Sequence, residues 1–313
     1  MNLNKGGNMN LQNGARPHQT LLDEYVDYLR SERRLTEPTV KAHRDHIAAM
    51  LEDVRCSPTE LSQQMSHSYV LAFFTQRAQG RRLTMRRQLQ GVLRLFLRFC
   101  FQKGHLDRDL SVAIPCIRSY KLSVTPRGIS EPDALKTMEC IDRTTPKGRR
   151  DFAIIQVLYY YGVRGGQVRA LQLADIHWRE NRIRFPSSKG GKELVAPLTE
   201  QVGNSLLDYL RHGRPPTSYS QVFLTVQLPI RPLKSPAVIS EMVHQRLSQA
   251  GVINPHKGSH IFRHAFAMRM LQRGQSLKTI ADLLGHRNIN TTFIYTKVDM
   301  EALRQAILEW PEV

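Results

Sequence analysis

The chain has 313 residues, and its 45 Lys and Arg against 27 Asp and Glu give a net charge of +18 at pH 7 and a pI near 10.1. No apolar run approaches the about 20 residues that a membrane-spanning helix needs, and no basic start followed by an apolar core indicates export. A surface this basic releases counterions when it binds a duplex, so we expect a nucleic-acid partner, no membrane, and a cytoplasmic protein that is nucleoid-associated when bound.

The first third of the chain predicts a small helical domain. Residues 1–18 are polar and rich in Asn and Gly, and we expect them to be disordered. Apolar residues then recur at helical spacing, with plausible start and stop signals, over residues 20–31, 36–54, 66–78 and 84–103. These helices predict an all-helical, DNA-binding domain at residues 19–114.

The last two of these helices are basic on one side. Residues 61–106 contain no acidic residue, and their arginines alternate with apolar positions of helical period. The candidate DNA-binding residues are Arg77, Arg81, Arg82, Arg86, Arg87, Arg94 and Arg98. A solvated face that binds nothing is the alternative, but such a face normally mixes both signs of charge, so the pattern favours phosphate contact.

A Pro-, Gly- and Lys/Arg-containing segment, residues 115–129, predicts an extended linker to a second domain at residues 130–313. In that domain a helix at 149–161 is stopped by Gly162, and a second helix is expected at 167–173. Arg164 stands at the junction, near free backbone N–H groups that favour anions.

After Asp175 the period changes to two. Residues 182–185 and 194–196 read as two strands around a loop that carries Lys189 and Lys192, which predicts a β-hairpin. Further helices are expected at 200–211 and 235–250.

The segment from residue 260 to residue 295 concentrates groups that bind and attack phosphate. His260 and Arg263, at i and i+3, fall on one face of a helix that Ser259 is placed to cap and Gly274 to end. A short helix at 277–284, between Ser276 and Gly285, presents His286, and Tyr295 follows one loop later. His256, His260 and His264 are also spaced by four, but no thiol or His-Glu-x-x-His pattern completes a zinc site, so we expect no metal.

These residues together resemble the tyrosine recombinases, the integrase family that includes phage integrases and the Xer resolvases. His-Ile-Phe-Arg-His and Leu-Leu-Gly-His-x-x-Ile-x-Thr-Thr stand as in the family, and the likeness extends over nearly the whole chain. The residues that match the family's catalytic positions, in its order, are Arg164, Lys189, His260, Arg263, His286 and Tyr295. Lys192 is the alternative to Lys189 as the catalytic lysine.

The resemblance implies a mainly α fold with a small β-hairpin or sheet. It implies a helical core-binding (SAM-like) domain, followed by an α+β catalytic domain. The tail of that domain, residues 299–313, has apolar residues on one side of a helix, so we expect it to dock on a neighbouring protomer or to pack on its own domain. It also implies a site-specific recombinase that cuts and rejoins double-stranded DNA through a 3′-phosphotyrosyl link without cofactor, metal or ATP. We expect a homotetramer, or a heterotetramer with a related recombinase, on two DNA sites, in integration, excision or dimer resolution.

Gly165, Gly166 and Gln167 differ from the family's usual apolar, small and acidic residues after the first arginine. We expect the glycines to loosen the backbone, and Gln167, which keeps the size but loses the charge, to temper activity without abolishing it. A DNA-binding regulator or accessory protein with weakened catalysis, and a type IB topoisomerase-like enzyme, are the alternatives.

Overall fold

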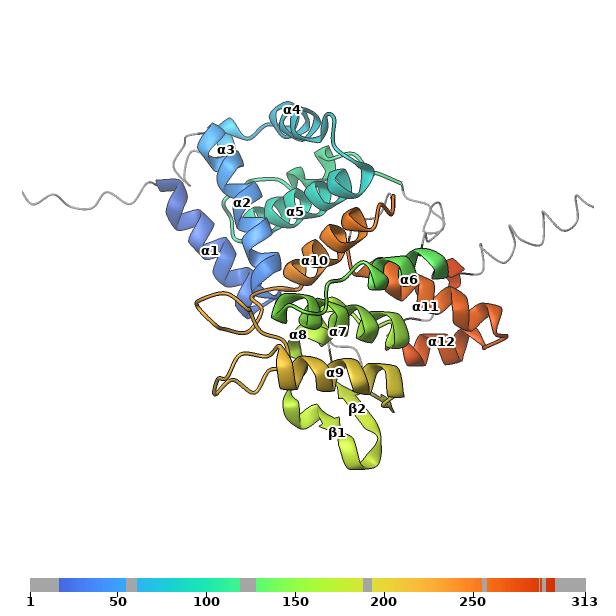
Figure 1. Ribbon diagram of the computed structural model, residues 1–313. Helices are drawn as coiled ribbons and strands as arrows, with labels where there is room; N and C mark the ends of the chain where they lie inside the picture. The colour runs from blue at the N-terminus through green and yellow to red at the C-terminus, as the bar shows by residue number, and fades with distance from the viewer. Residues whose placement is uncertain are drawn as a thin grey trace, which may run out of the picture. The chain divides into compact units, whose positions relative to one another are not determined.

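The computed structural model describes residues 17–54, 61–118, 128–187, 193–254, 258–286, 288 and 291–295, in a mainly helical fold with one three-stranded sheet (Figure 1). Backbone contacts divide the chain into two compact units, Met1–Tyr120 and Lys121–Val313, and the division falls inside the predicted linker. The tail, 299–313, and most of the segment expected to be disordered lie outside the described residues. None of the described helices is both long and apolar enough to cross a membrane.

The first unit contains the four predicted helices, with ends that differ by at most three residues from the prediction. Two short turns of helix, α3 and η1, were not predicted. The elements are α1 (Pro17–Ser31), α2 (Glu37–Val54), α3 (Leu61–Gln64), α4 (His67–Ala78), α5 (Leu83–Gln102) and η1 (Leu110–Ala113).

The core of this unit forms because α5 buries its apolar positions against α1 and α2. Tyr25 of α1 is fully buried, and its ring centroid lies 5.1 Å from that of Phe96 and 5.2 Å from that of Phe99, both on α5. Such aromatic pairs add to the hydrophobic stabilisation from burial. The apolar face predicted for α5 is therefore confirmed as a core face.

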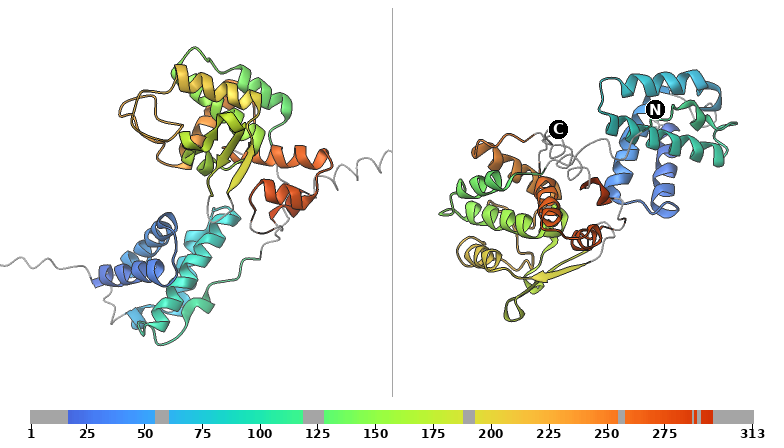
Figure 2. Two further views of the ribbon diagram at one scale, coloured as in Figure 1. Left: turned by 90° about the horizontal axis from the view of Figure 1, so that it is seen from below. Right: turned by 90° about the vertical axis from the view of Figure 1, so that its right-hand side faces the viewer.

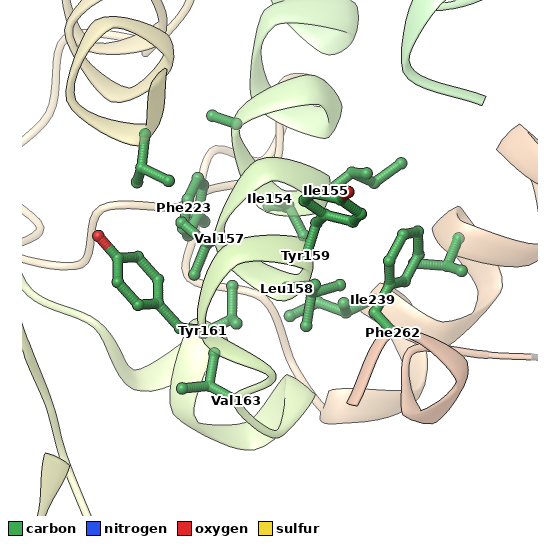
Figure 3. Packing of buried hydrophobic residues seen from close by; sticks show 14 of the residues in the cluster. Ile154, Ile155, Val157, Leu158, Tyr159, Tyr161, Val163, Phe223, Ile239 and Phe262 are labelled. Carbon is green, nitrogen blue, oxygen red and sulfur yellow. The ribbon is translucent and has the colours of Figure 1, made fainter. Parts of the chain in front are cut away.

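The second unit is built around α7. Its elements are α6 (Glu131–Glu139), α7 (Pro146–Tyr161), α8 (Gly165–Ala170), η2 (Leu173–Asp175), β1 (Ile176–His177), η3 (Trp178–Glu180), β2 (Arg182–Phe185), β3 (Leu194–Pro197), α9 (Glu200–His212), α10 (Pro236–Gln249), α11 (His260–Gln272), α12 (Leu277–Leu283) and η5 (Phe293–Tyr295). Figure 3 shows Phe223 on one side of α7 and Ile239 and Phe262 on the other. All three side chains are at most 1% exposed, so α7 is covered on both sides.

Both ends of α7 are set by local sequence. The Thr145 hydroxyl accepts a hydrogen bond from the Gly148 N–H at 3.0 Å, which satisfies one of the free donors at the start of the helix. Pro146 occupies the first turn, where its missing N–H removes no hydrogen bond of the helix. At the other end Gly162 adopts a left-handed conformation, φ 58°, as predicted. A Cβ on Gly162 would lie 2.7 Å from Phe266 of α11, so glycine also permits close packing between the two helices.

The sheet is antiparallel, in the order β1-β2-β3, and lies at the margin of the helical unit (Figures 1 and 2). The predicted hairpin is confirmed: β2 pairs with β3 from Arg182 with Pro197 to Phe185 with Leu194. Ile183 and Phe185 are buried while the alternate side chains are exposed, as period two requires. β1 was not predicted.

A buried ion cluster fixes α10 to α7. Asp151 is 0% exposed, and its carboxylate accepts from the guanidinium groups of Arg150 at 2.7 Å and Arg246 at 2.6 Å. Two arginines thus compensate one carboxylate in the interior, and each contact is a charge-assisted hydrogen bond. The cluster therefore holds α10, one of the helices on which α8 packs, against α7.

Candidate active site

Arg263 joins two helix ends. It lies in the first turn of α11, is 4% exposed, and donates to the carbonyl oxygen of Gly162 at 3.0 Å and to that of Leu284 at 2.7 Å. Gly162 ends α7 and Leu284 ends α12, so one guanidinium connects three helices. Burial, followed by the charge of Arg164, lowers the pKa of Arg263 to about 10, which leaves it a cation at neutral pH.

Arg164 directly precedes α8, two residues after Gly162. It is partly buried, and that burial lowers its pKa. Because the charge of Arg164 contributes to the lowered pKa of Arg263, the site holds two cations close together.

Gln167 fixes the backbone at this junction. Its side chain is 4% exposed; Oε1 accepts the Arg164 N–H at 3.1 Å and Nε2 donates to the Pro186 carbonyl at 3.1 Å. Pro186 follows β2 and precedes the loop that carries Lys189. An amide fits because it meets a donor and an acceptor at once, a pair of contacts that an ionised acid cannot make.

Gly165 has a packing role that the sequence did not predict, while the expected loosening by the glycine pair stays a prediction. Gly165 is buried as the first residue of α8, and a Cβ there would lie 3.0 Å from the Ser259 hydroxyl, so the glycine permits close packing. Ser259 was expected to cap α11, but it already has helical φ and ψ and no side-chain cap bond, since its hydroxyl pairs with Ser240 at 3.2 Å. Gly274, with φ 74°, does end α11 as predicted.

His286 is placed by the end of α12. Ser276 caps that helix, Gly285 follows it with φ 60°, and the His286 Nδ1 lies 2.8 Å from the Thr292 hydroxyl. Burial, followed by Arg263, Arg164 and His264, lowers the pKa of His286 to about 4. His286 is therefore a neutral hydrogen-bonding group at neutral pH.

Tyr295 lies in η5 and is 2% exposed. Phe266, Ala267, Ile280 and Leu284 form the buried cluster around it. Its hydroxyl lies 2.9 Å from the Nδ1 of His264, the residue after Arg263. Burial raises the pKa of Tyr295, and Arg263 partly offsets the rise.

These groups make a positively charged centre beside a phenol. In the part of the chain that the structure describes, neither Arg164 nor Arg263 forms an ion pair with a carboxylate, and the acceptors of Arg263 are neutral carbonyls. Cations that are partly desolvated and lack an anionic partner attract one from outside, and a phosphodiester has the charge and the fork-matching oxygens. The arrangement can bind phosphate and stabilise charge that builds on it.

The structure thus brings together Arg164, Arg263, His286 and Tyr295 from the predicted set. His260 lies one turn before Arg263 on α11 and is exposed, so its role at the site stays a prediction. Lys189 and its alternative, Lys192, lie outside the described residues.

The predicted DNA-binding arginines divide into two groups. Those around the turn between α4 and α5 are exposed or half-buried: Arg77, Arg81, Arg82, Arg86 and Arg87. Arg94 instead donates to the Ile114 carbonyl at 2.6 Å, and Arg98 donates to the Ser111 hydroxyl at 3.2 Å. These two arginines hold η1 against α5, a structural role that helical spacing alone does not reveal.

His264, whose Nδ1 contacts the Tyr295 hydroxyl, is absent from the predicted set of site residues. Its position four residues after His260 and next to Arg263 was a usable signal, because i and i+4 share a helix face. The spacing does not reveal that the chain returns at η5 and brings Tyr295 to the face of α11 that carries His264.

Comparison with known proteins gives consistent matches. The model of the phage integrase family matches residues 129–302. The protein y4rA of Sinorhizobium fredii, which carries the name of an integrase/recombinase, is 37% identical over 92% of this chain and 70% of its own length. Tyrosine recombinase XerD of Yersinia pestis is 30% identical over 91% of this chain and 95% of its own.

Among solved structures, a lambda integrase tetramer bound to a Holliday junction shares the fold. The TM-score is 0.66, with 17% identity over 87% of this chain and 74% of that one.

Proposed function

The chain belongs to the phage integrase family and is a tyrosine-type site-specific recombinase that acts on DNA, and from this premise we propose that Tyr295 is its nucleophile. The observation that carries the proposal is the buried Tyr295 phenol beside Arg263, whose charge no carboxylate of the described residues neutralises. The predicted alternatives, a regulator of this fold and a topoisomerase-like enzyme, have no observation that favours them.

In the proposed reaction the two arginines replace a metal. In-line attack adds negative charge to the equatorial oxygens of the phosphodiester, and permanently charged, fork-shaped donors stabilise that charge. Arg164 and Arg263 take this role, and the neutral His286 donates a hydrogen bond to a phosphate oxygen. His260, at the exposed start of α11, meets the phosphate from the solvent side and assists proton transfer.

The Tyr295 oxygen displaces the 5′ oxygen, which leaves a 3′-phosphotyrosyl link and a free 5′ hydroxyl. The leaving oxygen must gain a proton, and Lys189 is the proposed donor because it lies in the loop between β2 and β3. The link retains the energy of the phosphodiester, so rejoining requires no ATP.

We assign DNA clamping to the first unit. The arginines around the turn between α4 and α5 are placed for phosphate contacts, which give affinity and register rather than sequence specificity. The crystal structure of the lambda integrase tetramer on a Holliday junction supports the same assembly for this chain, as a homotetramer or with a related recombinase. Integration, excision or dimer resolution in the cytoplasm is the proposed setting.

The experiment uses a library of nicked suicide duplexes with randomised arms, incubated with the full chain in EDTA. Attack next to the nick releases a short strand, so the covalent adduct accumulates and its DNA can be sequenced. We expect an adduct with wild type and none with Tyr295→Phe. Tyr219→Phe, a change at an exposed tyrosine of the same unit, is the matched control and retains the adduct.

The outcomes separate the functions. Wild-type protein that binds the duplexes but gives no adduct in EDTA contradicts the proposed metal-free chemistry. An adduct recovered equally from all sequences contradicts site specificity and indicates a topoisomerase-like activity.

A further inference from the structure

The hydroxyl of Tyr295 has a specific protein partner. The Nδ1 atom of His264 lies 2.9 Å from it, and the two ring centroids are 5.8 Å apart with an interplanar angle of 58°. This is a good hydrogen-bond distance between a side chain on α11 and one on η5, 31 residues later.

Both partners are held from several directions. His264 follows Arg263, whose guanidinium is bound to two carbonyls, so the backbone of α11 is fixed at this turn. The Tyr295 N–H donates to the Thr292 carbonyl at 3.0 Å, and the Tyr295 ring is 2% exposed. The contact therefore joins two fixed groups, and the buried phenol is not simply bonded to solvent.

The attack on phosphorus requires a proton acceptor for the hydroxyl of Tyr295. A phenol must lose its proton to become a phosphoester, and burial makes the free phenolate costly. In the imidazole tautomer whose Nδ1 carries no proton, that atom can accept the phenol proton at hydrogen-bond distance. His260, the other histidine of α11, lies a turn earlier and is exposed, whereas His286 points its Nδ1 to Thr292.

We propose that His264 is a catalytic residue that accepts the Tyr295 proton during strand cleavage and returns it during rejoining. The inference rests on the proposed function, since it assumes that Tyr295 is the nucleophile. It assigns uptake of the tyrosine proton to the last histidine of the His-Ile-Phe-Arg-His segment.

The step balances as follows. The phenol oxygen forms the bond to phosphorus, its O–H bond breaks, and the proton moves to Nδ1, which makes His264 an imidazolium. The bond from phosphorus to the 5′ oxygen breaks, and that oxygen takes its proton from a separate donor, proposed as Lys189. In rejoining, the incoming 5′ hydroxyl loses its proton to that donor and the departing phenolate recovers its own from His264.

The test compares His264→Asn with wild type in single-turnover cleavage of a duplex selected as above. Asparagine can hydrogen-bond the phenol but cannot take up its proton, so we expect cleavage to slow by about 100-fold or more with unchanged DNA affinity. His212→Asn is the matched control, because His212 also uses its Nδ1, to bond Asp208, but is exposed and remote from the site. We expect it to cleave at the wild-type rate.

Two readouts distinguish a proton acceptor from a structural residue. The charged and titratable groups around His264 are Arg263 on its own helix, His286 after α12 and Tyr295 on η5, with Arg164 coupled to His286. The wild-type cleavage rate should rise with pH as one histidine loses its proton, while in His264→Asn the rise should move upward to the ionisation of Tyr295.

The second readout is a 5′-bridging phosphorothiolate, whose sulfur leaves without a proton. It should restore cleavage in Lys189→Ala but not in His264→Asn. Restoration in His264→Asn would assign His264 to the leaving group and overturn the inference. So would a wild-type or faster rate in a folded variant, which would make the contact a brake on Tyr295.

If His264→Asn fails to fold by circular dichroism, His264→Gln is used with the same criteria. A wild-type protein that gives no adduct at all contradicts the proposed function. Wild-type adduct with an unaffected variant contradicts only the role of His264.

Discussion

Replacing Asp151 by asparagine tests how the second unit supports its site. Asp151 is 0% exposed and accepts four hydrogen bonds, from Nε and a terminal nitrogen of both Arg150 and Arg246, at 2.6 to 3.1 Å. Asp151→Asn keeps the size but removes the negative charge and turns one acceptor oxygen into an NH₂ that faces donors. Two guanidinium groups are then left without their anion in the interior.

Breaking a buried ion pair by removing one partner costs about 3–5 kcal/mol. In a unit of this size about 1 kcal/mol moves Tm by about 2–4 °C, so we expect a fall in Tm of about 6 to 20 °C. The measurement is thermal unfolding followed by tryptophan fluorescence. Both tryptophans, Trp178 and Trp310, lie in the second unit, so the signal reports on that unit.

Asp208→Asn is the control. Asp208 pairs with Arg149 at 3.3 Å on the same unit, but its side chain is 41% exposed, and such a pair contributes about 0–1 kcal/mol. If Asp151→Asn lowers Tm no more than Asp208→Asn does, the reasoning from burial is refuted.

Three further results are expected. Gln167→Leu leaves the two backbone partners of the amide unsatisfied, so the free energy of unfolding measured by urea titration should fall by about 1–3 kcal/mol. The formation of the covalent adduct should also slow, and an unchanged rate would show that Gln167 does not position the site. The pKa of His286 is about 4 in the folded chain against 6.5 in the unfolded chain, so the unfolded chain binds the proton more tightly and the free energy of unfolding should fall as pH drops from 6.5 towards 4. His286→Asn should flatten that part of the stability profile, and parallel profiles of the variant and the wild type would contradict the prediction. Removing Arg86 and Arg87 together should reduce the slope of log affinity against log salt by about 2 if both contact phosphate, and an unaltered slope would show that they do not.

The sequence predicted the parts of this fold whose signals are local. α5 and α7 follow apolar positions at helical spacing, α12 has its serine cap and glycine stop, and the β2–β3 hairpin follows period two. β1 could not be found in this way, because its two residues are a strand only through pairing with β2. α6 begins with a Ser130 cap and a proline in its first turn, signals that were present but were read as part of the domain's start.

The candidate site was predictable as a set of residue types, and less so as a geometry. Arg263 and Tyr295 could be named from their motifs, but their burial depends on α7, α12 and η5, which meet only in the folded chain. The same limit hid His264 and separated His260 from Arg263, since a helix face does not say which of its turns is covered. Gln167 looked like a loss of charge and is a two-sided hydrogen-bond bridge in the structure.

The two anchors of Arg263 are main-chain carbonyls, which has an evolutionary consequence. A single substitution can delete the carboxylate that holds Arg150 and Arg246, but none can delete the carbonyl of residue 162 or 284. The orientation of this arginine is therefore inherited with the path of the backbone rather than with any partner side chain. In proteins that hold this arginine through main-chain carbonyls, the sequence around the site can diverge widely while the guanidinium keeps its orientation, provided that the helix ends keep their positions.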